Sequence, residues 1–404
     1  MSDEKIFMDH VSTTPCDPRV VEAMRPYFSE RYGNPSSQIH EQGVLASKAI
    51  DQAREQVAGL VNAAPKGVVF TSGATEANNL AMFGLAGIRG KEYRRILISE
   101  VEHYSIYYTM EPLRAHGYEV ETVPVDKTGL VRPEALAKKL RPDTALVSIQ
   151  HANGEIGAVQ PLAELAALAH AQGALFHSDA AVSAGLVPLD MKAFGIDALT
   201  LSAHNFYGPK GVGALVLADG LRPRPRAYGG WQEGGLRSGT ENVPGIVGMG
   251  MAAQIAKAEL ADTASRLETL ARRLRDGIAS RIRFVHFTGD RERRLPGHVS
   301  FWVEHVEGES LILFLNARGI MAASGSACSS NLKAHDEEEL VASHVLAAVG
   351  VPTDICAGSV CLSLGKQNTE EDVERLLGEL PATVDRLLMM SPSYADYLKQ
   401  QKHR

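Results

Sequence analysis

The feature that most constrains the fold is an alternation of short apolar runs with amphipathic stretches between about residues 45 and 250. Several apolar runs are continuous, which is typical of strands covered on both faces. Helical patterns lie between most of them, for example at Gln42–Leu60 and Leu162–Ala171. The sequence therefore predicts an α/β fold in which helices cover a mostly parallel sheet. The predicted strands are Val68–Thr71, Ile96–Ser99, Glu119–Val123, Ala145–Gln150, Ala174–His177, Ala198–Ser202 and Gly213–Leu217.

The pattern changes after about residue 255. A charged helical stretch at Ala256–Ile278 leads to an apolar run at Val299–Val303 and then to mixed helices and strands. We predict a large domain formed by residues 15–255 and a smaller α+β domain formed by residues 1–14 and 256–404. The length of 404 residues agrees with two or three domains. The stretch Ser324–Ser343 is rich in Ser, Gly, Ala and charged residues, and we expect it to be a mobile loop.

Composition excludes several classes of function. Hydrophobic residues make up 45% of the chain and charged residues 22%, which is typical of a soluble globular protein. The formal charge of -7 and the lack of a long basic run argue against nucleic-acid or membrane-surface partners. No apolar run reaches the roughly 18 residues of a membrane span, and the N-terminus lacks a signal-peptide pattern. We therefore expect a cytoplasmic protein.

The four cysteines, at positions 16, 328, 356 and 361, are too few and too scattered for a disulfide framework. They show no CxxC spacing, which argues against a closed zinc site. Cys328 lies in Ser324-Gly325-Ser326-Ala327-Cys328-Ser329-Ser330, and such small, polar flanks favour an exposed, reactive thiol over an inert buried one.

Three segments that follow predicted strands carry candidate site residues. The turn in residues 71–79 opens a helix, and its free backbone N–H groups could bind phosphate, although an ordinary helix cap gives the same pattern. Asp179 lies just past a strand, at the edge of the sheet where α/β proteins bind ligands, or simply caps a helix. His103 also follows a strand, and a lone histidine is more often structural.

Taken together, the order and spacing of these segments closely resemble the cysteine desulfurases of iron–sulfur assembly. These form a branch of the class V aminotransferase-like enzymes, which have pyridoxal-phosphate (PLP) fold type I. The resemblance covers nearly the whole chain. The matching segments are Ser12-Thr13-Thr14-Pro15, residues 32–37, residues 71–79, residues 202–213, residues 236–242, residues 324–330, Ser363-Leu364-Gly365 and Met390-Ser391-Pro392.

The resemblance implies how a cofactor would be held. Thr75, Ser202 and His204, together with Ala74, would bind the PLP phosphate. Thr240 would reach the phosphate from the other subunit of a homodimer.

It also implies the remaining roles. Asp179 would pair with the pyridine nitrogen and keep the ring an electron sink. His103 would stack on the ring, and Asn34 would contact the substrate. Cys328 would take sulfur from cysteine and carry it as a persulfide to a scaffold or acceptor protein. We expect no metal site, except that Cys328 could be a transient ligand of an iron–sulfur cluster.

Position 205 departs from this family. In the segment Ser202-Ala203-His204-Asn205 the family has a lysine after the histidine, which forms a Schiff base with the cofactor aldehyde. Asn205 has an amide nitrogen without a basic lone pair, so it can neither form the imine nor move a proton. PLP is therefore expected without a covalent lysine link, or not at all.

Three further departures fall on the same half of the site. Val182 replaces a glutamine and Gly154 an asparagine, both near the phenolic oxygen of the cofactor, and Cys361 replaces an arginine that binds the substrate carboxylate. Losing a positioned acid–base group typically costs roughly 10²–10⁴ in rate. Losing an arginine–carboxylate contact removes roughly 1.5–3 kcal/mol. An engineered lysine knockout would not explain the other three changes, so the sequence favours natural divergence.

Three functions remain open. The first is a desulfurase-derived protein with lost or weakened lysine catalysis, which keeps the dimer and uses Cys328 to accept sulfur from sulfide or a persulfide, or to present a thiol to a cluster. The second is an active desulfurase that turns L-cysteine into L-alanine with PLP held non-covalently. The third is a PLP-free scaffold unrelated to sulfur, against which the Cys328 motif argues. Lys210 as a substitute lysine and His204 as a base are lesser alternatives, and Cys361 could be a second thiol in the pocket.

Overall fold

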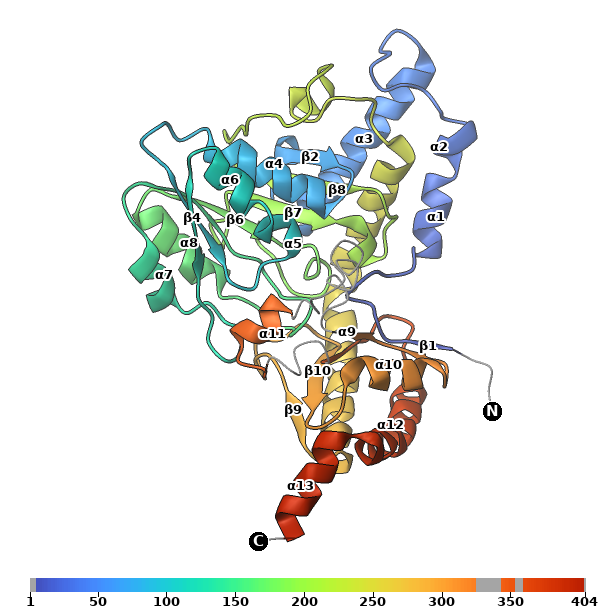
Figure 1. Ribbon diagram of the computed structural model, residues 1–404. Coiled ribbons are helices and arrows are strands. Elements are labelled where there is room, and N and C mark those ends of the chain that lie inside the picture. The colour runs from blue at the N-terminus through green and yellow to red at the C-terminus, as the bar shows by residue number, and fades with distance from the viewer. Residues whose placement is uncertain (1–4, 325–342, 353–358, 403–404) are drawn as a thin grey trace.

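The computed structural model describes residues 5–324, 343–352 and 359–402. The chain forms a large body that carries the main sheet and a smaller body that holds both termini (Figure 1). The predicted mobile loop lies almost entirely outside the described residues, and so does Cys328.

The main sheet has seven strands in the order β2-β8-β7-β6-β5-β3-β4. Its strands are parallel except β8, which runs antiparallel to both β7 and β2. This confirms the predicted fold class, and each predicted strand is found within two residues of its expected bounds. The strands are β2 (Val68–Thr71), β3 (Arg95–Ser99), β4 (Glu119–Val123), β5 (Thr144–Ser148), β6 (Leu175–Asp179), β7 (Ala198–Ser202) and β8 (Gly213–Leu217).

Helices cover both faces of this sheet, because alternate apolar residues of each strand point to opposite sides. Helices α1, α3, α7, α8 and the first half of α9 pack on one face, and α4, α5 and α6 on the other. Short 3-10 turns occur at Pro65–Gly67, Ala203–Phe206 and Gln232–Gly235. The helices of the large body are α1 (Pro18–Met24), α2 (Pro26–Ser29), α3 (Glu41–Leu60), α4 (Ala74–Ala86), α5 (Tyr104–Tyr107), α6 (Met110–Ala115), α7 (Pro133–Lys139) and α8 (Leu162–Ala171).

Helix α9 (Val243–Arg281) is 39 residues long and starts well before the predicted Ala256. Its first half contains glycines, which normally weaken a helix. Here they let α9 approach its neighbours closely, since a Cβ on Gly248 would lie 2.6 Å from the Met24 sulfur and one on Gly250 2.6 Å from the Ala53 Cα. Tertiary packing therefore overrides the local preference.

The small body has its own core. It contains an antiparallel sheet in the order β12-β13-β10-β9, and a parallel pair of β1 with β11 that brings Ile6 and Met8 into this core. The second half of α9 packs here too. The distinct clusters of the two bodies support the division near residue 255, which stays a prediction, and a further small cluster packs Val101 and Ile156 against Val345 across the junction. The elements are β1 (Ile6–Phe7), β9 (Val285–Phe287), β10 (His298–Val303), β11 (Ile320–Met321), β12 (Ala323–Ser324), β13 (Val360–Ser363), α10 (Gly308–Asn316), α11 (His344–Ala348), α12 (Glu370–Met390) and α13 (Pro392–Lys402).

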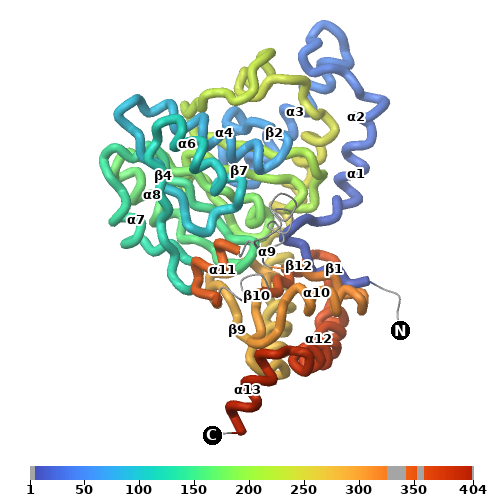
Figure 2. The backbone as a smooth tube through the Cα atoms, viewed as in Figure 1, coloured from blue at the N-terminus to red at the C-terminus, as the bar shows by residue number. Residues whose placement is uncertain are grey.

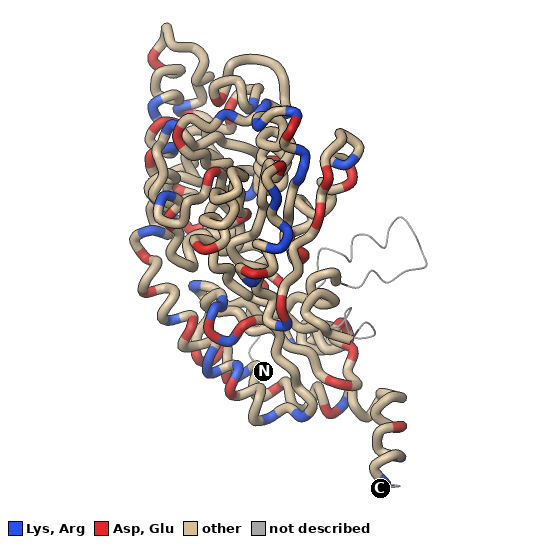
Figure 3. Tube along the Cα trace, turned by 90° about the vertical axis from the view of Figure 1, so that its left-hand side faces the viewer, with Lys and Arg blue, Asp and Glu red and all other residues tan. Residues whose placement is uncertain are grey.

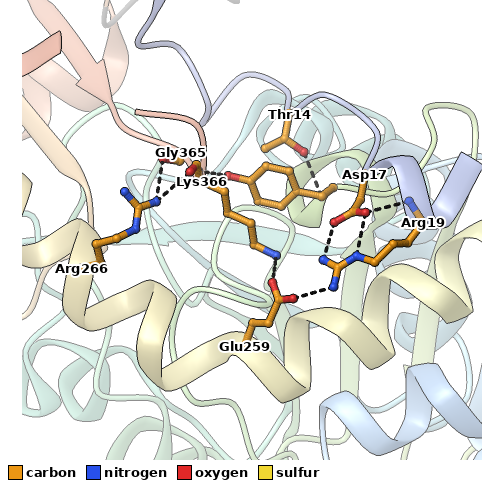
Figure 4. Close-up of polar contacts among 8 residues, drawn as sticks. Thr14, Asp17, Arg19, Glu259, Arg266, Gly365 and Lys366 are labelled. Carbon is orange, nitrogen blue, oxygen red and sulfur yellow. Dashed lines mark hydrogen bonds and ion pairs between the residues drawn. The ribbon is translucent and has the colours of Figure 1, made fainter. Parts of the chain in front are cut away.

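Polar contacts tie the two bodies together beside α9 (Figure 4). Glu259 on α9 binds Arg19 at 2.8 Å and Lys366, which follows β13, at 2.6 Å. Arg266, two helical turns further along, donates to the backbone oxygens of Lys366 at 2.9 Å and Asn368 at 2.8 Å. The N-terminal segment runs through the junction between the bodies (Figure 2).

Lys and Arg positions are interspersed with Asp and Glu positions along the traced chain (Figure 3). This mixture agrees with the absence of a long basic run from the sequence. Within the described ranges, no helix combines the length and apolar character needed to cross a bilayer.

Candidate active site

A cavity of about 530 Å³ lies where the carboxyl ends of the main strands meet the N-terminal segment and the small body. Its lining includes parts of the segments at residues 12–15, 71–79 and 202–213, which were singled out above. Ser324 and His344, the described residues near the two ends of the Cys328 segment, also line it. Of the predicted site residues, those that line it are Ala74, Thr75, His103, Gly154, Asp179, Val182, Ser202, His204, Asn205 and Cys361.

Two predicted residues do not line this cavity. Asn34 is exposed and accepts a hydrogen bond from the Ser36 backbone at 2.9 Å. Thr240 is also exposed on this chain. The substrate role of Asn34 and the cross-subunit role of Thr240 therefore stay predictions about an assembly of two chains.

One end of the cavity has the features of a phosphate site. The first intrahelical bond of α4 runs from the Ala77 N–H to the Gly73 oxygen, so the N–H groups of Ala74, Thr75 and Glu76 precede it. No side chain caps this helix end, and a Cβ on Gly73 would meet no atom within 4 Å. An anion can therefore approach these N–H groups and the positive end of the helix dipole.

Two side chains from the end of β7 complete this end. The Ser202 hydroxyl is buried and has no partner among the described residues, which leaves it available to a ligand. His204 lies with its Nδ1 3.2 Å from the Thr13 hydroxyl, and burial, followed by the charge of Lys210, lowers its pKa. His204 is therefore a neutral hydrogen-bonding group at pH 7 rather than a cation.

The centre of the cavity suits a pyridine ring. Asp179, at the end of β6, accepts hydrogen bonds from the Asn78 amide at 2.7 Å and from the Ala181 N–H at 2.9 Å, which fix its carboxylate. His103 is held by Ser105, whose hydroxyl lies 2.8 Å from its Nδ1. These residues fit the phosphate and the ring nitrogen of PLP, and their roles toward it stay predictions.

The side of the cavity around position 205, where the family has its catalytic lysine, differs from the family pattern. Asn205 donates from its Nδ2 to the Val11 carbonyl at 2.9 Å, so its amide is already engaged. Of the described lysines, Lys210 lines the cavity, and its Nζ donates to the Thr14 carbonyl at 3.2 Å. Position 205 therefore offers no amine, and the amine of Lys210 is held by its hydrogen bond to Thr14.

The four departures form one connected patch. Beside Asn205, the Val11 side chain lies 3.2 Å from the place of a Cβ on Gly154, and Val182 lies 3.8 Å from the same point. The Gly154 carbonyl in turn accepts from the Cys361 thiol at 3.6 Å. Changes at four distant positions therefore meet around Val11 and Gly154.

Cys361 is a buried thiol at the edge of the cavity. Its sulfur lies 3.3 Å from the His298 Nε2, and burial strongly raises its pKa above the ordinary thiol value. It is therefore protonated and packed, which disfavours the hypothesis that it is a second reactive thiol.

Sequence reasoning missed three residues that shape the cavity. Val11 precedes a recognised motif, but nothing local marks it as a contact of Asn205. His298 begins a buried strand, where an isolated histidine carries no signal. Glu155 is half-buried, loss of contact with water raises the pKa of its carboxyl to about 7, and the Ser343 hydroxyl donates to it at 2.5 Å.

Glu102, beside His103, is a fourth missed group. It accepts hydrogen bonds from Ser99 at 2.5 Å and from the Gln150 N–H at 2.8 Å, while its second oxygen has no partner among the described residues. Burial raises its pKa to about 8, so it is largely protonated at pH 7.

Known proteins resemble this chain over nearly all of its length. The family model of class-V aminotransferases matches residues 6–376. Cysteine desulfurase IscS 1 of Archaeoglobus fulgidus is 45% identical over 388 residues, which span 96% of this chain and 99% of that protein. Cysteine desulfurase IscS of Methanosarcina thermophila is 44% identical over 96% of this chain and 94% of its own length.

A solved structure shows the same arrangement. A NifS-like protein superposes with a TM-score of 0.87 at 35% sequence identity, covering 95% of this chain and all of its own. On these grounds the chain belongs to the class-V aminotransferase family and, within it, to the cysteine desulfurases.

Proposed function

We propose that this protein works in sulfur mobilisation for iron–sulfur cluster assembly, with lysine-dependent desulfurase catalysis lost or severely weakened. Cys328 would carry sulfur as a persulfide or present its thiol to a cluster. The observation that supports this most is the hydrogen bond from the Asn205 amide to Val11, because it uses the side chain at the catalytic position for packing.

PLP, when bound, supplies an electron sink to the amino acid attached to it. The α4 N-terminus, Ser202 and His204 would hold its phosphate. Asp179 would hold a proton at the ring nitrogen, and His103 would cover the ring. None of these groups replaces the lysine that takes and returns a proton at the substrate carbon. The protein would therefore still bind PLP while its catalytic turnover is lost or weak.

The Cys328 segment is proposed to act at this cavity because Ser324 and His344, the described residues near its two ends, both line it. Persulfide sulfur would come from another persulfide: the Cys328 thiolate takes its outer sulfur while the donor leaves as a thiol. An iron–sulfur scaffold or another acceptor protein would receive that sulfur by the same exchange.

Turnover can be tested by measuring alanine released from L-cysteine. We expect a negligible rate for the wild type and little gain for Asn205→Lys alone, because Val182, Gly154 and Cys361 also depart. Restoring all four positions, with Asn205→Lys, Val182→Gln, Gly154→Asn and Cys361→Arg, should raise the rate. A wild-type rate that Cys328→Ala abolishes would overturn the proposal.

The alternative is an active desulfurase with non-covalent PLP, which the intact phosphate end of the cavity favours. The two are separated by alanine release from L-cysteine: a wild-type rate that depends on added PLP and is abolished by Cys328→Ala favours the alternative. A third case, in which Lys210 replaces the missing lysine, is tested by reducing the purified protein with borohydride and mapping its peptides. We expect no reduced cofactor on Lys210. An adduct at that lysine would show that another amine has replaced the missing one.

We also propose a homodimer, in which Thr240 of one chain reaches the phosphate end of the other. Sedimentation velocity should give a particle of twice the chain mass. Thr240→Val should weaken PLP binding without changing the sedimentation coefficient, since the substitution keeps the side-chain volume.

A further inference from the structure

Uncharged and acidic groups surround Cys361 at one end of the cavity, where the family resemblance leads us to expect an arginine. Cys361 lies on β13, and its sulfur has two uncharged hydrogen-bonding partners, the His298 Nε2 at 3.3 Å and the Gly154 carbonyl at 3.6 Å. An arginine at this position would offer five N–H donors to a carboxylate. A thiol offers one weak S–H donor, and in Cys361 this donor is already used in the hydrogen bond to the Gly154 carbonyl.

His298 does not supply the missing charge. Its Nε2 lies 2.9 Å from the Gly154 carbonyl, so this nitrogen carries the proton, and its Nδ1 accepts from Arg294 at 3.2 Å. Burial, followed by the charge of Arg294, lowers the pKa of His298 to about 3. The imidazole is therefore neutral at any pH at which the protein is handled.

Arg294 points the other way. Its Nε donates to the Asp290 carbonyl at 2.9 Å, and its remaining nitrogens are engaged by His298 and the Thr288 carbonyl. It does not line the cavity. Its guanidinium is thus turned toward the backbone of the small body, and it acts on Cys361 through its charge, which lowers the pKa of that thiol against the larger effect of burial.

Acidic groups approach from the opposite side. Burial raises the pKa of Cys361 most, the charges of Asp9 and then Glu155 raise it further, and the charge of Arg294 lowers it. Of these charged groups, Glu155 lines the cavity. Glu155 has a pKa of about 7, so it carries a negative charge at pH 8. A substrate carboxylate at this wall would lose its water and meet repulsion instead of a charge-assisted hydrogen bond.

We propose that this end of the cavity selects small thiol compounds that lack a carboxylate, with Cys361 and Glu155 as the lining residues that reject the carboxylate and His298 as the neutral partner behind Cys361. This rests on the proposed function and names its substrate class. Amines without an acid group, such as cysteamine, fit this wall better than L-cysteine, and hydrogen sulfide belongs to the same class.

The test compares the dissociation constants of L-cysteine and cysteamine, which differ only in the carboxylate, by isothermal titration of the full-length protein at pH 8. The wild type should bind cysteamine about tenfold or more tightly. Sodium hydrosulfide should compete with cysteamine. Cys361→Arg should shift the ratio toward L-cysteine by about ten- to one-hundredfold, as expected for one charge-assisted contact. Cys361→Ser, a neutral side chain of similar size, should leave the ratio unchanged.

Because Arg at a buried strand position could prevent folding, Glu155→Gln provides a second variant of nearly the same shape. It should shift the ratio toward L-cysteine several-fold. Preference of the wild type for L-cysteine, equal shifts in the Arg and Ser variants, no shift in Glu155→Gln, or no binding of either compound would each overturn the inference. The proposed function would survive these outcomes, since it is judged by alanine release and by the reactions of Cys328.

Discussion

The Asn205 side chain donates a hydrogen bond to the Val11 carbonyl at 2.9 Å, across 194 residues of sequence. The position that resemblance assigns to a catalytic lysine thus fastens the N-terminal segment to the main sheet. The side chain at this position therefore takes part in packing.

This hydrogen bond should be measurable as stability. Asn205→Ala leaves the Val11 carbonyl without its donor in a buried place, and we expect the free energy of unfolding to fall by about 1–3 kcal/mol. Urea denaturation would measure it. Gln56→Ala is the control, because its side chain pairs with Gln254 at the surface, where substitutions usually stay within about 0.5 kcal/mol. Equal effects in both variants would mean that the Asn205 contact is not important.

Glu102 should make the protein less stable at alkaline pH. Burial raises its pKa from 4.5 to about 8, so the folded chain holds a proton that the unfolded chain releases above pH 4.5. This contribution is complete at low pH and is lost as the pH rises toward 8.

Buried histidines act in the opposite direction at lower pH. Burial lowers the pKa of His151 to about 4, and that of His177 and His298 to about 3, so their contribution grows as the pH rises to about 6.5. Thermal midpoints should therefore peak near pH 6.5. Glu102→Gln should flatten the decline between pH 6.5 and 8.5, and an unchanged slope would assign the decline to other groups.

The Glu259–Lys366 pair should couple the two bodies. The two side chains are 35% and 19% exposed, so their interaction is partly shielded from water. A double-mutant cycle with Glu259→Gln and Lys366→Met should give a coupling of about 1 kcal/mol, near the upper end for pairs of this kind. The exposed Arg273–Glu374 pair should give a smaller value, and a coupling of zero for Glu259 would show that the contact is incidental.

Cys361 should resist alkylation in the folded protein. Its thiol is 1% exposed and its pKa is raised by burial, so thiolate is scarce at pH 8. Mass spectrometry after treatment with iodoacetamide should show it reacting at least about tenfold more slowly than Cys16, which is partly exposed. In urea the two rates should converge. Rapid labelling of Cys361 in the native state would revive the hypothesis of a second reactive thiol.

The sequence predicted the sheet well because its strands are buried on both faces and therefore appear as continuous apolar runs. It also predicted most of the cavity, because Asp179, Ser202 and the turn at Ala74 each follow a strand, and parallel strands end at one edge. It missed the first half of α9, whose glycines serve a close approach to α3. The contacts of Asn205 with Val11 and of Cys361 with His298 join residues far apart in sequence, and local sequence patterns do not predict such long-range contacts.

Between the last residue that α9 gives to the large core, Ala256, and the first that it gives to the small core, Leu267, the helix runs through a stretch that belongs to neither. An α-helix turns about 100° per residue, so one inserted amino acid in this stretch would swing the whole C-terminal body around the axis by that angle. Ser324 and Cys361 would leave the cavity together. Related sequences should consequently show no insertions or deletions within residues 257–266, although many of these residues are exposed. The number of residues in this stretch sets the rotation of the small body relative to the large body about the helix axis.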